Sequence, residues 1–86
     1  MKIFKYKLPV GDNVSISMPK GAEYLTIQTQ YDYPYLWAIV NPENETIEHK
    51  FCVRGTGHEF QGNEGNYIST FQMRDSELVF HVFERN

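Results

Sequence analysis

Turn-forming residues interrupt this chain at short intervals, and no other feature of the sequence limits the fold as strongly. Between the turns lie short runs rich in β-branched and aromatic residues, which favour a pleated strand over a helix. The sequence therefore predicts about seven strands and no helix. The expected strands lie near residues 2–8, 14–18, 24–31, 35–41, 46–54, 67–73 and 77–84.

Two of these runs are apolar on both faces. In residues 35–40 one face carries Leu, Ala and Val and the other carries Tyr, Trp and Ile, and residues 77–84 have the same character. Both strands are expected at the centre of the fold, with Trp37 in the core. If the fold buries only one face, the other is an apolar patch typical of a subunit interface, so we expect a homo-oligomer. The expected interface residues are Tyr31, Tyr33, Val79 and Phe83.

The length of 86 residues suits one domain, residues 1–86, with a single small core. Six Phe, six Tyr and one Trp supply much apolar area for so short a chain. Hairpin turns are expected at residues 31–34 and at Asp75–Ser76. The fold class is therefore all-β, as a single small antiparallel β-sandwich or a partly open barrel.

Composition indicates the cellular setting. The single cysteine, Cys52, cannot form an intramolecular disulfide, and the N-terminal residues lack the continuous apolar run of a signal peptide. No segment is apolar over the length of a membrane span, which favours a cytoplasmic protein without a membrane partner. The formal charge of −3 argues against nucleic acid as the main partner, although the early lysines leave a small anionic ligand open.

The sequence gives little support to a metal site or to catalysis. His49 and Cys52 are three residues apart on one strand and so face opposite sides, which does not suit one metal ion. We expect no cofactor or metal, with His49 and His81 partly buried and hydrogen-bonded and Cys52 a surface thiol. A serine–histidine–aspartate arrangement lacks a nucleophile motif, and every Asp lies in an expected turn. No catalytic residue is therefore assigned.

A binding site is expected where the fifth strand ends. Arg54, Gly55, Thr56, Gly57 and His58 place a guanidinium, exposed backbone N–H groups, a hydroxyl and an imidazole together at the start of a long loop. Such a group can hold a phosphate or carboxylate. Tyr67 and Arg74 flank the next strand and are expected to join the site.

Several segments resemble a family of small proteins encoded by bacteriophages and prophages. They are Tyr6 to Leu8, Met18 to Ala22, Leu36 to Ala38, Gly55 to His58, Tyr67 to Gln72 and Leu78 to Glu84. The resemblance spans nearly the whole chain and transfers no established catalytic or binding residue. By analogy of size and origin, other small phage proteins form oligomeric sponges that sequester nucleotide signals of host immunity.

The resemblance leads to two hypotheses. In the first, a phage-encoded, non-enzymatic homo-oligomer in the host cell cytoplasm sequesters a small anionic nucleotide-type signal and so counteracts antiviral defence. In the second, the chain is a protein–protein interaction module that inhibits a host defence protein without a small ligand. A hydrolase that acts on the same signal is the remaining enzymatic alternative.

Overall fold

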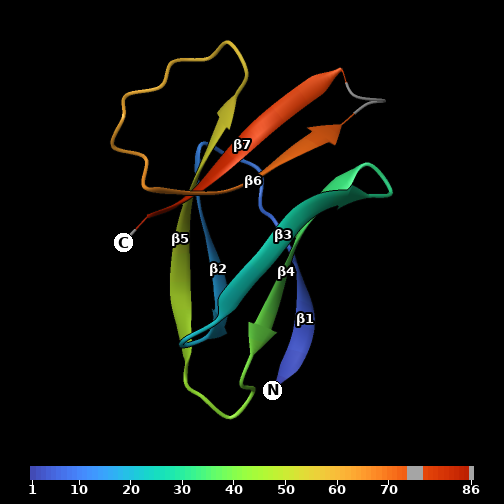
Figure 1. Cartoon of the computed structure of the whole chain (residues 1–86), viewed down its shortest axis with the longest axis vertical. Helices are drawn as coiled ribbons and strands as arrows, with labels where there is room; N and C mark the ends of the chain where they lie inside the picture. The colour runs from blue at the N-terminus through green and yellow to red at the C-terminus, as the bar shows by residue number, and fades with distance from the viewer. Residues whose placement is uncertain (74–76, 86) are drawn as a thin grey trace.

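The computed structural model describes residues 1–73 and 77–85, and it confirms all seven expected strands. Every strand boundary lies within two residues of the expected one, and Figure 1 shows how the strands are arranged. The described residues form no helix, and so none that is long and apolar enough to cross a membrane. The strands are β1 (Lys2–Lys7), β2 (Asn13–Pro19), β3 (Glu23–Gln30), β4 (Tyr33–Val40), β5 (Thr46–Gly55), β6 (Asn66–Met73) and β7 (Leu78–Arg85).

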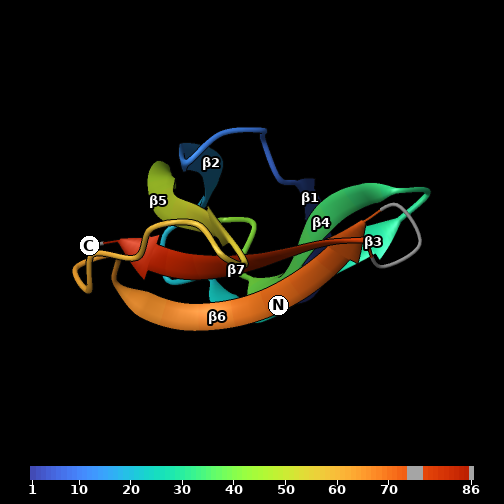
Figure 2. The ribbon, with the colours of Figure 1, turned by 90° about the horizontal axis from the view of Figure 1, so that it is seen from above.

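The strands form two antiparallel sheets, so the sandwich is the one of the two expected architectures that the chain adopts. One sheet has the order β1-β4-β3 and the other β2-β5-β7-β6, as Figures 1 and 2 show. β4 and β7 are inner strands, which confirms the central positions expected for the two doubly apolar runs. At one edge β3 contacts β6, where the Ser69 hydroxyl donates to the Ile27 carbonyl at 3.2 Å.

The core lies between the sheets and uses one face of each strand. β4 contributes Leu36, Ala38 and Val40, and their burial is complete. The other face of β4 carries Trp37, which is only half-buried, because no second layer covers that side of the three-stranded sheet. The expectation that Trp37 belongs to the core is therefore wrong. The remaining core side chains are Leu8, Ile16, Met18, Ile27, Phe51, Val53, Phe71 and Val82.

The hairpin between β3 and β4 is tighter than the sequence indicated. Gln30 pairs directly with Tyr33, so Tyr31 and Asp32 alone make the turn, with φ of 54° and 58°. Two positive φ values in a two-residue loop are typical of a type I′ turn. Pro34, expected in the turn, is buried inside β4 instead. The second expected turn, Asp75–Ser76, lies outside the described residues.

Candidate functional site

The long loop 56–65 joins β5 to β6 and is anchored by a buried carboxylate. Glu64 is 1% exposed, and Oε2 lies 3.3 Å from Nε of Arg54. The same carboxylate accepts hydrogen bonds from the backbone N–H groups of Gln61 and Gly62, both at 2.8 Å. These bonds to the charged form, from the Gln61 N–H above all, lower the pKa of Glu64 although burial opposes them. The loop is therefore held in one shape by the residue that ends β5.

Arg54 has a second structural contact besides this ion pair. Its Nη1 donates to the backbone carbonyl of Asp12 at 2.8 Å and to that of Val53 at 3.1 Å. The expected anion-binding arginine thus ties together the segment before β2, strand β5 and the loop. Its part in ligand binding stays a prediction.

Thr56 and Tyr67, both expected at the site, belong to a chain of hydrogen bonds that crosses β7. The Thr56 hydroxyl lies 2.7 Å from Nε2 of His81, and Nδ1 of His81 lies 3.0 Å from the Thr70 hydroxyl. The Thr70 hydroxyl in turn lies 2.7 Å from the Tyr67 hydroxyl. His81 is half-buried and has two partners, as expected. This chain fixes the start of the loop to the four-stranded sheet.

His58 lies against the end of β5. A Cβ on Gly55 would be 2.7 Å from Nδ1 of His58, so the imidazole rests where only glycine leaves room. Gly57, with φ of 87°, makes the turn that returns the chain toward Gly55, and the His58 N–H donates to the Gly55 carbonyl at 3.0 Å. Gly55 and Gly57 together therefore fix the position of the His58 ring.

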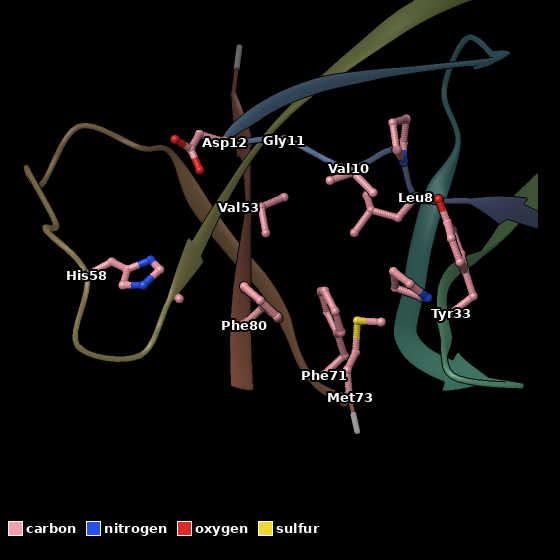
Figure 3. Close-up of a pocket in the computed structure, with 13 residues that line it drawn as sticks. Leu8, Val10, Gly11, Asp12, Tyr33, Val53, His58, Phe71, Met73 and Phe80 are labelled. Carbon is pink, nitrogen blue, oxygen red and sulfur yellow. The ribbon is translucent and has the colours of Figure 1, made fainter. Parts of the chain in front are cut away.

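An apolar cavity of about 240 Å³ opens between the two sheets beside His58. Figure 3 shows His58 toward one end of it and Tyr33 at the other. Its wall is almost wholly hydrocarbon, with three aromatic side chains that offer surfaces for a ring. The lining residues are Leu8, Pro9, Val10, Gly11, Asp12, Tyr33, Pro34, Val53, Gly55, His58, Phe71, Met73 and Phe80.

A polar hollow of about 460 Å³ adjoins the apolar cavity, since Asp12 and His58 line both. Two arginines, Arg54 and Arg85, line this hollow. Nη1 of Arg85 lies 3.1 Å from Sγ of Cys52 and 3.4 Å from Oδ1 of Asn13. No carboxylate among the described residues forms an ion pair with Arg85. The lining residues are Asp12, Asn13, Arg54, His58, Glu59, Gln61 and Arg85.

The structure divides the expected site. Arg54 and His58 line the polar hollow and Gly55 lines the apolar cavity, whereas Thr56 and Tyr67 belong to the separate hydrogen-bond chain. Arg74 lies outside the described residues.

Sequence reasoning missed Arg85 and the apolar wall of the cavity. Arg85 closes the last strand with no turn or motif beside it, and the wall residues read as ordinary core. Nothing in their local sequence marks either group as part of a site.

Cys52 is fully buried, so the expectation of a surface thiol is wrong. It does lie on the expected face of β5, but Asn13 and Arg85 cover it there. His49, on the other side of the strand, is half-buried and hydrogen-bonded as expected, with Nδ1 2.7 Å from the Tyr24 hydroxyl. Burial, with help from the nearby Glu84 carboxylate, raises the pKa of Tyr24. In the described part of the chain no three His, Cys, Asp or Glu residues gather as metal ligands would.

The fold and these two hollows define a small two-layer β-sandwich with a bipartite opening at one end. The chain belongs to the family described as a domain of unknown function, DUF7352, whose model matches residues 1–86. No curated protein and no solved structure matches the chain.

Proposed function

We propose that this protein is a non-enzymatic binding protein that captures a small ligand made of an apolar ring and an anionic group, as in a nucleotide. The observation that carries the proposal is the contact between an apolar cavity and a polar hollow that share Asp12 and His58. In the cytoplasm of a phage-infected host, such capture would sequester a nucleotide-type defence signal, in keeping with the resemblance to phage-encoded proteins.

The two hollows suit the two parts of such a ligand for different reasons. A planar ring gains by leaving water for a wall of hydrocarbon and aromatic side chains, which the cavity supplies. A phosphate gains from guanidinium and imidazole donors, which Arg85 and His58 supply in the hollow. Since Arg54 is already paired with Glu64, Arg85 is the stronger candidate for the anion.

The side chains favour capture over turnover. Among the described residues that line either hollow there is no serine, threonine or cysteine to act as a nucleophile. The two carboxylates, Asp12 and Glu59, come from loop segments outside the strands and so lack a rigid support for paired acid–base work.

Native mass spectrometry and calorimetry with cyclic dinucleotides and ADP-ribose derivatives test the proposal. We expect stoichiometric retention, release of intact ligand on heating, and at least tenfold weaker binding for Arg85→Gln and for Val10→Asp. Val10 is 89% exposed at the rim of the cavity, so Val10→Asp adds charge without disturbing the core. Lys50→Gln is the matched control, because Lys50 pairs with Arg85 across the strands but lines neither hollow. Failure of every nucleotide to bind, or equal binding by all variants, would refute the proposal, and altered ligand on release would show an enzyme.

The alternative, an interaction module without a small ligand, is favoured by two exposed aromatic features. Tyr31 is 95% exposed at the hairpin tip in a backbone conformation that tyrosine rarely adopts. On the four-stranded sheet, Phe83 contacts Phe60 and Tyr67 in a ring cluster that is partly open to solvent. Light scattering with Tyr31→Ala and Phe60→Ser tests oligomer formation and leaves the two hollows intact.

A further inference from the structure

The outer face of the three-stranded sheet carries a ladder of aromatic rings. Tyr33, Tyr35 and Trp37 lie on one face of β4, and the buried Pro34, Leu36 and Ala38 lie on the other. The ring centroids are 6.1 Å apart from Tyr33 to Tyr35 and 6.1 Å from Tyr35 to Trp37. The planes of successive rings are inclined by 58° and 61°. The rings therefore form steps along the strand and not one flat surface.

Lysines of the neighbouring strand β1 lie over these rings. Nζ of Lys7 is 4.1 Å from the Tyr33 ring centroid, and Nζ of Lys5 is 4.6 Å from that of Tyr35. The Lys5 ammonium also donates to Oε1 of Gln30 on β3 at 2.8 Å. Cations from one edge strand and amides from the other thus flank the ladder on both sides.

This sheet is basic in a chain that is acidic overall. β1 contains three lysines, of which Lys5 and Lys7 share the face of the rings, and neither β1 nor β4 contains an acidic residue. The third strand, β3, adds a single acid, Glu23, which pairs with Ile39 away from the Tyr33 end of the ladder. The formal charge of the whole chain is −3. The face therefore presents positive charge and exposed ring surface together.

We propose that this face binds single-stranded nucleic acid, chiefly through Lys5, Tyr35 and Trp37, which line neither hollow; Tyr33, at the end of the ladder, also lines the apolar cavity. The ammonium groups of Lys5 and Lys7 move from the tyrosine rings to the phosphates of the nucleic acid. The bases then stack on the rings that have become uncovered. The exchange is favourable because base–aromatic stacking is stronger than an exposed cation–π contact. Stacking needs no particular base, so little sequence preference is expected.

Other occupants fit the face less well. A flat polysaccharide surface requires coplanar rings, and these are inclined by about 60°. A second copy packed face to face would bring its lysines against those of the first. Lysines on an edge strand often have no role beyond preventing association with another sheet edge. Lys5 and Lys7, however, lie over rings of the neighbouring strand β4 and do not point away from the edge.

Trp37 makes a direct test possible, because it is the only tryptophan and lies on this face. Titration with oligo(dT) and oligo(U) should quench its fluorescence. If Lys5 and Lys7 each contact a phosphate, the affinity should fall with salt with a log–log slope of about −1.4. Lys5→Gln with Lys7→Gln should bring the slope close to zero. Lys20→Gln with Lys50→Gln makes the same change in net charge away from the face and should leave the slope near that of the native protein.

A second variant separates stacking from charge. Tyr35→Ala should weaken binding about tenfold while the salt slope is kept. Polyglutamate, an anion without bases, should not quench Trp37. The proposal is overturned if no oligonucleotide quenches Trp37, if polyglutamate quenches it equally, or if both lysine pairs change the slope alike. A nucleotide held in the hollows depends on Arg85 and leaves Trp37 unquenched, so the two proposals fail separately.

Discussion

Tyr31→Asn should stabilise the protein, because the native residue sits in an unfavourable backbone conformation. Tyr31 has φ of 54° in a turn whose next residue also has positive φ. For an ordinary L-residue this region costs about 1–2 kcal/mol, and asparagine occupies it far more readily. The side chain is 95% exposed, so its removal sacrifices little buried area. We expect the free energy of unfolding to rise by about 1 kcal/mol, which for a domain of this size raises Tm by about 4–8 °C.

Urea unfolding followed by circular dichroism measures this change, and Tyr31→Ala is the matched control. Alanine removes the same exposed ring but keeps a Cβ without the local hydrogen-bonding of asparagine, so its stability should stay within about 0.5 kcal/mol of the native value. Equal stabilisation by alanine and asparagine would refute the reasoning, since the cause would then be the exposed ring and not the backbone. If Tyr31 engages a protein partner, the stabilised variant should bind that partner more weakly.

Three further outcomes are expected. The lowered pKa of Glu64 adds stability that is present above pH 4.5, the usual value, and is lost as the pH falls through the lower native pKa. Glu64→Gln should therefore flatten the acid side of a stability–pH curve, and an unchanged acid limb would count against the anchor. Gly57→Ala should cost about 1–2 kcal/mol for backbone conformation alone. Gly65→Ala should cost about 1–3 kcal/mol more, because its Cβ would overlap the backbone carbonyl of Glu84 in β7; equal losses in urea unfolding would contradict this. Native Cys52 should react with a thiol reagent far more slowly than in urea, and rapid native labelling would show that the thiol is accessible.

The strands could be predicted because each carries its signal locally. Alternating side chains and turn residues define a strand within its own few residues, and all seven were found this way. The two-residue turn at Tyr31 and Asp32 was missed because neither residue is the glycine or asparagine that such turns prefer. Pro34 led us to extend the expected turn to residue 34. It lies in β4 instead, at a position beyond the last residue that pairs with β1.

The two faces of β4 could not be told apart from the sequence. Both are apolar, and only the arrangement of the sheets decides that Leu36 is enclosed while Trp37 faces outward. Cys52 shows the converse error. Its neighbours Lys50 and Arg54 indicate a surface, yet the Arg85 side chain closes over the thiol.

Both candidate binding regions depend on contacts between distant parts of the chain, so the local motif at residues 54–58 indicates only part of one region and net charge indicates neither. Lys5 meets Gln30 across 25 residues, and Arg85 meets Asn13 across 72. The strand order β1-β4-β3 brings the lysine-rich first strand beside the aromatic fourth strand, although two other strands separate them in sequence. The net charge of −3 is a sum over the whole chain and does not show where the lysines gather. It therefore argues only against nonspecific binding by the whole surface. That argument does not apply to the ring-bearing face, because salt screens charges that are more than a Debye length away. A phosphate at this face therefore interacts mainly with the nearby lysines and not with the acidic residues elsewhere on the protein.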